Sequence, residues 1–187
     1  MTSIKEILTD CETRMTKALD NLRNELAKIR TGRATTALLD TVRVEAYGSE
    51  VPINQVANVT VSDAHTLSLQ VWDKGLMGHV EKAIRSANLG LNPVNDGTMI
   101  RVPMPPLTEE RRKEIVKLVK KFGEEAKVSV RNVRRDAMEH LKKAEKAEHF
   151  SEDDRKRGED DVQKKTDAKT KDIDGIVAIK DKEVMAV

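Results

Sequence analysis

The chain has 187 residues, and its 34 Lys and Arg residues nearly balance 32 Asp and Glu residues, which leaves a formal net charge of +2. Because the chain as a whole is not strongly basic, a nucleic-acid-binding surface would have to be confined to one local face. Four aromatic residues are too few for a base-stacking platform, and the single cysteine excludes an internal disulfide framework and a cysteine-based zinc cluster.

Residues 4–29 carry apolar side chains at helical spacing, which predicts an amphipathic helix with a coiled-coil-like seam. The seam consists of Ile4, Leu8, Cys11, Met15, Ala18, Leu22, Leu26 and Ile29. We expect the helix to stop near Thr31 and Gly32, because glycine favours the left-handed turn that follows a helix end.

The block 31–105 differs in composition from the rest of the chain. Only 13 of its 75 residues are charged, against 53 of the remaining 112. Alternating apolar and polar residues predict short strands at 42–46, 59–61, 67–71 and 99–102, and residues 77–88 predict a short helix. This block is therefore expected to form a small α/β domain inserted into a charged helical one.

Prolines at 103, 105 and 106 predict an extended connector after this block. A long helix should follow from Thr108 to about Glu148, with Glu109 and Glu110 near its positive end. Its predicted apolar seam comprises Ile115, Val119, Phe122, Ala126, Val130, Val133, Ala137, Leu141 and Ala144.

Ser151 and Asp154 have the spacing of a capping box and predict the start of a third helix. Its apolar residues are Val162, Thr166, Ile173, Ile176 and Val177. The predicted fold class is α+β: an antiparallel three-helix bundle from residues 1–30 and 106–187, with a β/α/β sandwich domain inserted at 31–105. Two adjacent connectors, at 30–33 and 103–106, predict a hinge.

Enzyme signatures are missing from the sequence: it contains no GxxxxGK[ST], GxSxG or HExxH motif. The four histidines are scattered over both predicted domains without metal-ligand spacing, so we expect no metal site. Cys11 lies on the apolar seam and is expected to be a buried side chain rather than a nucleophile. The sequence therefore favours a protein that is not an enzyme and that needs no cofactor.

One face of the long predicted helix is cationic. At about 100° per residue, one side beside the apolar seam collects Lys120, Lys127, Arg131, Arg134 and Arg135. Arginine offers a planar fork of donors that suits phosphate, and the like-charged i,i+4 pair Arg131–Arg135 does not help the helix itself. The pattern is typical of a phosphate-backbone-binding face, although an ordinary solvated helix face remains open as an alternative.

Several long motifs together resemble the bacterial ribosome recycling factor family. They are KIRTGRA (28–34), LGLNP (89–93), IRVPMPPLTEERRKE (100–114), VRNVRRDA (130–137), and SEDD (151–154) with DDVQKKTD (160–167). The resemblance implies a three-helix bundle with a small sandwich domain. It also implies that the protein acts with elongation factor G to split the 70S ribosome after termination, with the bundle on large-subunit rRNA and the small domain rotating about a hinge.

The resemblance also assigns residues. The RNA-contacting set is Arg112, Arg131, Arg134 and Arg135, to which the cationic face adds Lys127. One hinge strand is Arg30, Thr31, Gly32 and Arg33, and the other contains Pro103, Pro105 and Pro106. A cytoplasmic monomer with no membrane partner is expected. Two other classes stay open: a helical module that binds a protein, and an enzyme with an unrecognised site in the middle domain.

Overall fold

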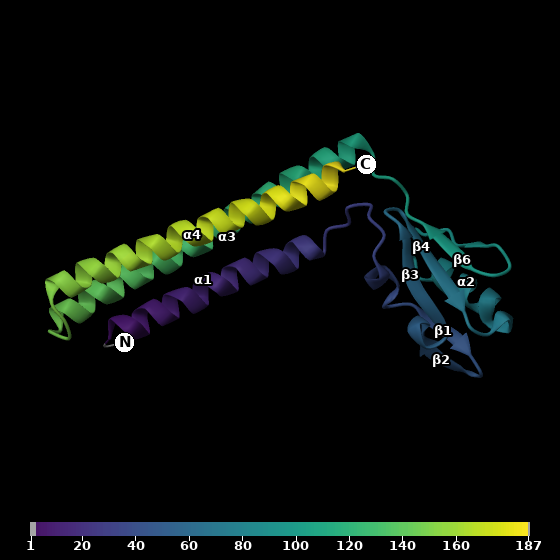
Figure 1. Cartoon of the computed structure of the whole chain (residues 1–187), viewed down its shortest axis with the longest axis horizontal. Coiled ribbons are helices and arrows are strands. Elements are labelled where there is room, and N and C mark those ends of the chain that lie inside the picture. Colours follow the sequence, from purple (N-terminus) through teal and green to yellow (C-terminus); the bar gives the residue numbers. More distant parts are fainter. Residues whose placement is uncertain (1–2, 187) are drawn as a thin grey trace. The chain divides into compact units, whose positions relative to one another are not determined.

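The structure is a computed structural model that describes residues 3–186, and the chain divides into two compact units (Figure 1). The first unit is built from the residues up to Arg30 together with those from Glu109 onward. The second unit is the continuous segment Thr31–Thr108. We call them the bundle and the small unit, and their combination of helices with small antiparallel sheets confirms the α+β class.

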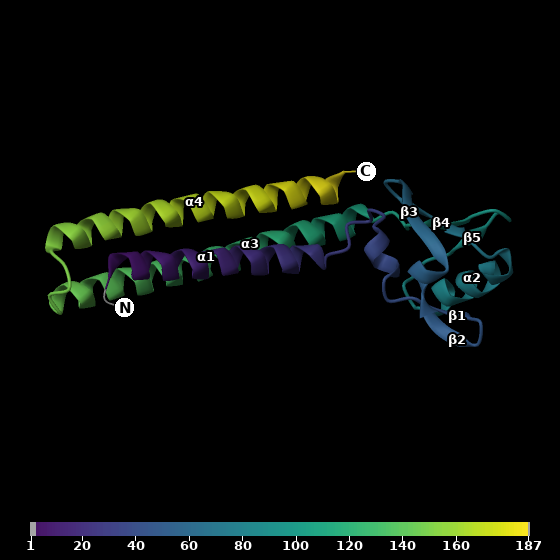
Figure 2. The ribbon, with the colours of Figure 1, turned by 60° about the horizontal axis from the view of Figure 1, so that its bottom comes forward.

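The bundle consists of α1 (Ile4–Ala27), α3 (Glu109–Lys146) and α4 (Glu152–Met185), which lie side by side (Figures 1 and 2). Helices α1 and α4 run in the same direction, and α3 runs opposite to both (Figure 1). An amphipathic helix of this kind gains most of its stability by burying its apolar stripe against its neighbours. No helix of residues 3–186 has the length and apolar character that crossing a bilayer requires.

Helix α1 begins with a capping box, in which Ser3 and Glu6 satisfy each other's backbone N–H groups. Its buried side chains are Ile7, Cys11, Met15, Leu19, Leu22 and Leu26. The predicted seam missed Ile7 and Leu19, and it included positions that are only partly buried, such as Leu8. The difference arises because α1 packs against two neighbouring helices, so its buried face is not a single narrow seam. The helix also ends earlier than predicted, at Ala27.

The seam predicted for α3 is confirmed at all positions but one. Phe122 is only partly buried, and Gly123 is buried beside it. The capping box predicted for α4 is also confirmed, because Ser151 Oγ accepts from Asp154 N and Asp154 Oδ2 accepts from Ser151 N. Helix α4 buries Gly158, Val162, Thr166, Ile173 and Val184.

Two glycines allow α3 and α4 to approach each other closely. A Cβ at Gly123 would lie 2.6 Å from Val177 Cγ2, and a Cβ at Gly158 would lie 2.9 Å from Leu141 Cδ2. Gly175, also on α4, is exposed and has no neighbouring atom within 4 Å of such a Cβ. Close packing of the two helices thus requires glycine at positions 123 and 158. At position 175 the fold has room for a larger side chain.

Replacing Gly175 or Gly123 by alanine is expected to change the stability of the bundle in opposite directions. Gly175→Ala should stabilise the bundle by about 0.5–1 kcal/mol, because glycine has a high backbone entropy in the unfolded chain. Gly123→Ala gains the same propensity but must displace Val177, and overpacking of this kind costs about 1–3 kcal/mol. Urea unfolding of both variants checks the contrast. Equal stabilisation by both would mean that α3 and α4 have room at Gly123.

Ion pairs attach α1 to both other helices. Arg14 Nη2 lies 2.6 Å from Asp136 Oδ2 on α3. Glu12 lies 2.9 Å from Lys165 Nζ and 2.8 Å from Lys169 Nζ on α4. Hydrogen bonds from Lys169 and then Lys165 lower the pKa of the Glu12 carboxyl below its ordinary value. Glu12 therefore stays ionised to a lower pH in the folded chain than in the unfolded chain.

This pKa shift predicts a dependence of stability on pH. Because the folded pKa is lowered, the contribution of Glu12 is fully present above about pH 4.3 and is lost as the pH falls through the folded pKa. Glu12→Gln should therefore destabilise the bundle more at pH 7 than at pH 3. Solvent screening limits the difference to about 0.5–1 kcal/mol, since the side chain is 40% exposed. Urea unfolding at both pH values measures it, with Glu125→Gln as an exposed control. An equal loss of stability at both pH values would contradict the assignment.

The small unit contains six strands and the helix α2 (Met77–Ser86). Strands β1 (Arg43–Ala46) and β2 (Ser49–Pro52) form an antiparallel hairpin with α2 packed against β1. The second sheet has the order β3-β4-β6-β5 and is antiparallel throughout. Its strands are β3 (Ala57–Asp63), β4 (Thr66–Val71), β5 (Val94–Asn95) and β6 (Ile100–Pro103). Strands β2 and β5 were not predicted.

A continuous apolar core fills the small unit between the sheets and α2. Among its fully buried side chains are Leu39, Val44, Leu67, Leu69, Val80, Ile84, Ile100 and Val102. The alternation predicted from the sequence appears directly in β1 and β6, where every second residue is buried. The small unit thus has its own core and could fold as a unit.

Candidate nucleic-acid interface

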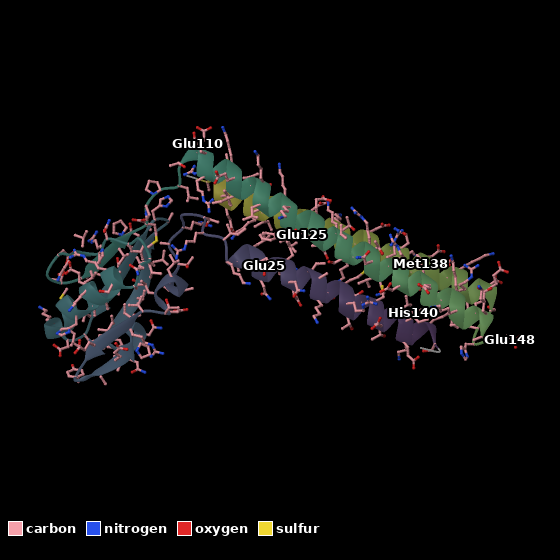
Figure 3. All side chains as sticks on the ribbon, turned by 180° about the vertical axis from the view of Figure 1, so that it is seen from behind. Glu25, Glu110, Glu125, Met138, His140 and Glu148 are labelled. Atoms are coloured by element: carbon pink, nitrogen blue, oxygen red, sulfur yellow. The ribbon has the colours of Figure 1, made fainter. Side chains whose placement is uncertain are left out.

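Three arginines lie close together within just over one turn of α3. Arg131 and Arg135 are exposed, whereas Val130, Val133 and Ala137 on the opposite side of this segment are buried in the bundle. A four-residue step advances about 6 Å along a helix, so the two exposed guanidinium groups start from neighbouring positions on one face. In Figure 3 this segment lies on α3 between the labelled Glu125 and Met138.

Arg134 lies at the boundary between α3 and α4. Its Nη1 donates to Gln163 Oε1 at 3.1 Å, and Gln163 Nε2 in turn donates to Asp167 Oδ1 at 2.8 Å. The Nε atom of Arg134 is buried and has no hydrogen-bond partner among residues 3–186. The neutral amide holds the guanidinium in place without neutralising its charge.

The nearest acidic residue in the sequence, Asp136, pairs with a residue of α1 and not with the three arginines. Its carboxylate accepts from Arg14 at 2.6 Å, and this hydrogen bond is the main reason that the pKa of Asp136 lies below its ordinary value. None of the three arginines Arg131, Arg134 and Arg135 forms an ion pair with a described residue. We call these three residues the arginine cluster. It is a local concentration of positive charge in a chain of nearly balanced charge.

Lys127 differs from the expectation that it would extend the cationic face. Its Nζ lies 2.7 Å from Asp174 on α4 and 3.5 Å from Glu124, and its side chain is only 20% exposed. The hydrogen bond to Asp174 raises the pKa of the lysine, so the pair is ionised and mutually neutralised. The sequence placed Lys127 on the correct side of α3, but its partner comes from another helix.

Arg112 is separate from the arginine cluster. It precedes Arg131 by 19 residues in the same helix, which corresponds to about 28 Å along the axis. Its side chain is partly buried, and its Nε is buried without a hydrogen-bond partner in the described part of the chain. The structure therefore brings together three of the five predicted RNA-contacting residues. Sequence reasoning missed Gln163, which positions Arg134 from 29 residues away.

The predicted hinge residues fall into two connectors at the ends of the small unit, and the first of them, Arg30, is the last residue before that unit begins. Gly32 has a φ of +76°, a conformation that favours glycine. Arg30, Thr31 and Arg33 flank it, while Pro105 and Pro106 are exposed in the second connector. Pro103 is an exception, because it is the last residue of β6 and pairs with Thr66. It belongs to the sheet rather than to the connector that was predicted to begin there.

Side chains that could bind a metal ion are not clustered in the described residues. No group of three or more His, Cys, Asp or Glu side chains there is placed to hold a metal ion. Cys11 is buried, and burial raises the pKa of its thiol. The arginine cluster is thus the candidate binding site that the geometry supports.

Comparison with known proteins gives matches to a single protein family. The family model described as "Ribosome recycling factor" matches residues 22–185. Proteins named ribosome-recycling factor from Burkholderia mallei (strain SAVP1) and Burkholderia pseudomallei (strain K96243) are each 56% identical to it over 185 residues. That alignment covers 99% of this chain and 100% of each relative.

Solved structures give the same result. A solution structure of the ribosome recycling factor has a TM-score of 0.71 and 44% identity and covers both chains completely. Models of the T. thermophilus ribosome recycling factor and the E. coli elongation factor G bound to the E. coli post-termination complex provide a second match. Its TM-score is 0.61 and its identity 44%, covering 98% of this chain and 100% of the other. Fold and matches together define a translation factor. The chain belongs to the ribosome recycling factor family.

Proposed function

We propose that this protein splits the post-termination 70S ribosome together with elongation factor G, as a cytoplasmic monomer. The bundle binds large-subunit rRNA through the arginine cluster, and the small unit moves about the two connectors. The single observation that carries the RNA contact is that Arg131, Arg134 and Arg135 make no ion pair with any described residue. Family membership supports the role in recycling.

The chemistry of the cluster fits phosphate rather than base edges. Guanidinium groups bind phosphate oxygens through two parallel N–H donors, and such contacts position a protein on RNA without reading its sequence. Bringing Arg131 and Arg135 together costs a few tenths of a kcal/mol in an isolated helix. Phosphates between the two side chains would more than offset that repulsion. Lys127 and Arg112 remain proposed secondary contacts, the former weakened by its pairing with Asp174.

The action proposed here is mechanical. The bundle supplies a rigid body, since its three helices share one buried interior. The chain has no nucleotide-binding motif, so GTP hydrolysis by elongation factor G supplies the energy. The connectors around Gly32 and around Pro105 and Pro106 allow the small unit to move while the bundle stays bound.

A single substitution tests the RNA contact. Arg134→Ala is expected to weaken ribosome binding by about 1–3 kcal/mol, because the variant loses one charge-assisted hydrogen bond to phosphate. The measurement is co-sedimentation with 70S ribosomes over a series of salt concentrations. The matched control is Lys142→Ala, an exposed cation on the same helix.

The salt series also separates the proposal from a protein-binding bundle. Contacts to phosphate release counterions, so the affinity should fall steeply with salt and the slope should be smaller for Arg134→Ala than for the unaltered chain. A folded Arg134→Ala variant that binds ribosomes normally would remove this residue from the interface. An affinity independent of salt would favour recognition of a protein surface instead.

A further inference from the structure

Helix α3 carries a second group of exposed cations, in the turns that precede the arginine cluster. Its members are Lys117, Lys120 and Lys121, and all three side chains are exposed. The segment that contains them lies on α3 between the labelled Glu110 and Glu125 (Figure 3). We call these three residues the lysine cluster. Because they are exposed, packing inside the bundle does not account for them.

The acidic residues on either side of the lysine cluster do not neutralise it. Glu114 pairs with Arg111 at 2.9 Å, and Glu124 pairs with Lys127 at 3.5 Å. Glu125 is exposed and follows the last lysine by four residues, but no ion pair joins the two. None of the three lysines forms an ion pair with a residue in the described part of the chain. The lysine cluster therefore keeps its positive charge.

The lysine cluster repeats the spacing of the arginine cluster. Each lysine precedes an arginine by 14 residues (117 and 131, 120 and 134, 121 and 135), which is about 21 Å along the helix. Each cluster surrounds one buried valine of the seam, Val119 or Val133, at positions −2, +1 and +2 from it. Lys117 and Arg135 lie 18 residues apart, which is about five full turns. The two clusters therefore lie on the same face of α3.

Helix stability does not explain this repeat. Like charges at positions i and i+4, such as Lys117 and Lys121, cost a few tenths of a kcal/mol in an isolated helix. Around the buried Leu141, the equivalent positions −2 and +2 hold Glu139 and Lys143, which form an ion pair at 2.6 Å. Opposite charges thus stabilise that part of α3, whereas like charges recur at the two clusters. Such a repeat is suited to a ligand that carries negative charge at several points, as a nucleic-acid backbone does.

We propose that the lysine cluster is a second binding site for RNA phosphates, about 21 Å from the arginine cluster on the same face of α3. A lysine ammonium binds phosphate as a point charge and needs no fixed planar orientation, which fits exposed side chains without a partner. The helix sets the distance between the two contacts on one ribosome. This inference rests on the RNA contact of the proposed function and deepens it.

The test combines Lys117→Gln, Lys120→Gln and Lys121→Gln in the full chain. Co-sedimentation with 70S ribosomes over a series of salt concentrations measures the affinity. The combined variant should bind at least about tenfold more weakly, and the slope of log affinity against log salt should become shallower by about 2, since each phosphate contact contributes about 0.7. Glutamine is a good helix former, so α3 should persist, and circular dichroism checks this.

Two further variants separate the site from charge in general. Lys164→Gln, Lys171→Gln and Lys182→Gln together remove the same charge from exposed positions of α4 and should leave the affinity within about twofold of the unaltered chain. Arginine at all three positions of the lysine cluster keeps the charge and should retain both the affinity and the salt slope.

Chemical acetylation of the unaltered chain provides a measurement that no substitution can disturb. With 70S ribosomes bound, the amines of the lysine cluster should lose most of their reactivity, because a phosphate contact shields them from the reagent. Lys164 and Lys171, which are exposed on α4, should react as in the free chain. Mass spectrometry of the peptides reads out each position, and full reactivity of the lysine cluster on the ribosome would overturn the inference.

The variants can also overturn it. An equal loss of affinity in the α4 variant would assign the effect to net charge, and a loss with an unchanged salt slope would assign the lysine cluster to a protein surface. Normal binding by the glutamine variant of the lysine cluster, with weakened binding by Arg134→Ala, would refute this inference alone. Normal binding by both would refute the RNA contact of the proposed function as well.

Discussion

Replacing both Arg131 and Arg135 by glutamate is expected to lower the affinity for 70S ribosomes by about a thousandfold. Each substitution removes a charge-assisted contact worth about 1–3 kcal/mol, and the two together correspond to roughly 4 kcal/mol. The new carboxylates would also repel phosphate. Both positions are exposed on α3, so the fold should tolerate the change.

Equilibrium co-sedimentation at fixed salt measures this loss, and circular dichroism checks that the helices persist. The matched control is the pair Lys142→Glu and Lys146→Glu. It lies on the same helix with the same four-residue spacing and the same change in charge, and both lysines are exposed. If both pairs weakened binding equally, the effect would come from net charge and the arginine cluster would lose its special role.

Gly32→Pro should slow subunit splitting by at least about tenfold while ribosome binding stays within about twofold of the unaltered chain. Gly32 has a φ of +76°, whereas proline holds φ near −65° and pushes the preceding residue towards an extended conformation. The first connector would therefore leave the small unit in a different direction. The arginine cluster on α3 is untouched, so binding and splitting should separate.

Light scattering during dissociation with elongation factor G and GTP measures the splitting rate. Gly90→Pro is the control, because Gly90 also has a positive φ, of +69°, and belongs to the same unit but to neither connector. Splitting at the normal rate by Gly32→Pro would contradict the hinge. An equal loss in Gly90→Pro would point to instability of the small unit instead.

The periodic parts of the chain were predictable from sequence because one pattern determined both structure and burial. In α3, almost every residue of the predicted seam is buried, and the capping box at Ser151 begins α4. Strands β2 and β5 lack such a pattern. The hairpin strand β2 has exposed residues at both Ser49 and Glu50, and β5 consists of two exposed residues. Short strands without alternation cannot be recognised locally.

In the candidate site, too, features within one helix were predictable from the sequence, and contacts between helices were not. Helical spacing placed Arg131 and Arg135 on one exposed face, and the structure agrees with that placement. The spacing within α3 could not show that Lys127 meets Asp174, or that Arg134 meets Gln163, because both partners come from α4. Likewise, the contact of His65 with Gly32 joins residues 33 positions apart and depends on how β3 and β4 turn.

The order of elements along the chain has a consequence for synthesis. The small unit is one continuous segment, Thr31–Thr108, so all its contacts are available once that segment has left the translating ribosome. Helix α1 emerges first, but its partners α3 and α4 follow only after the small unit. At about 5–20 residues per second, the apolar stripe of α1 waits roughly 10–30 seconds before α4 is complete. A newly made chain would thus pass through a stage in which the small unit is complete while the apolar face of α1 has no partner.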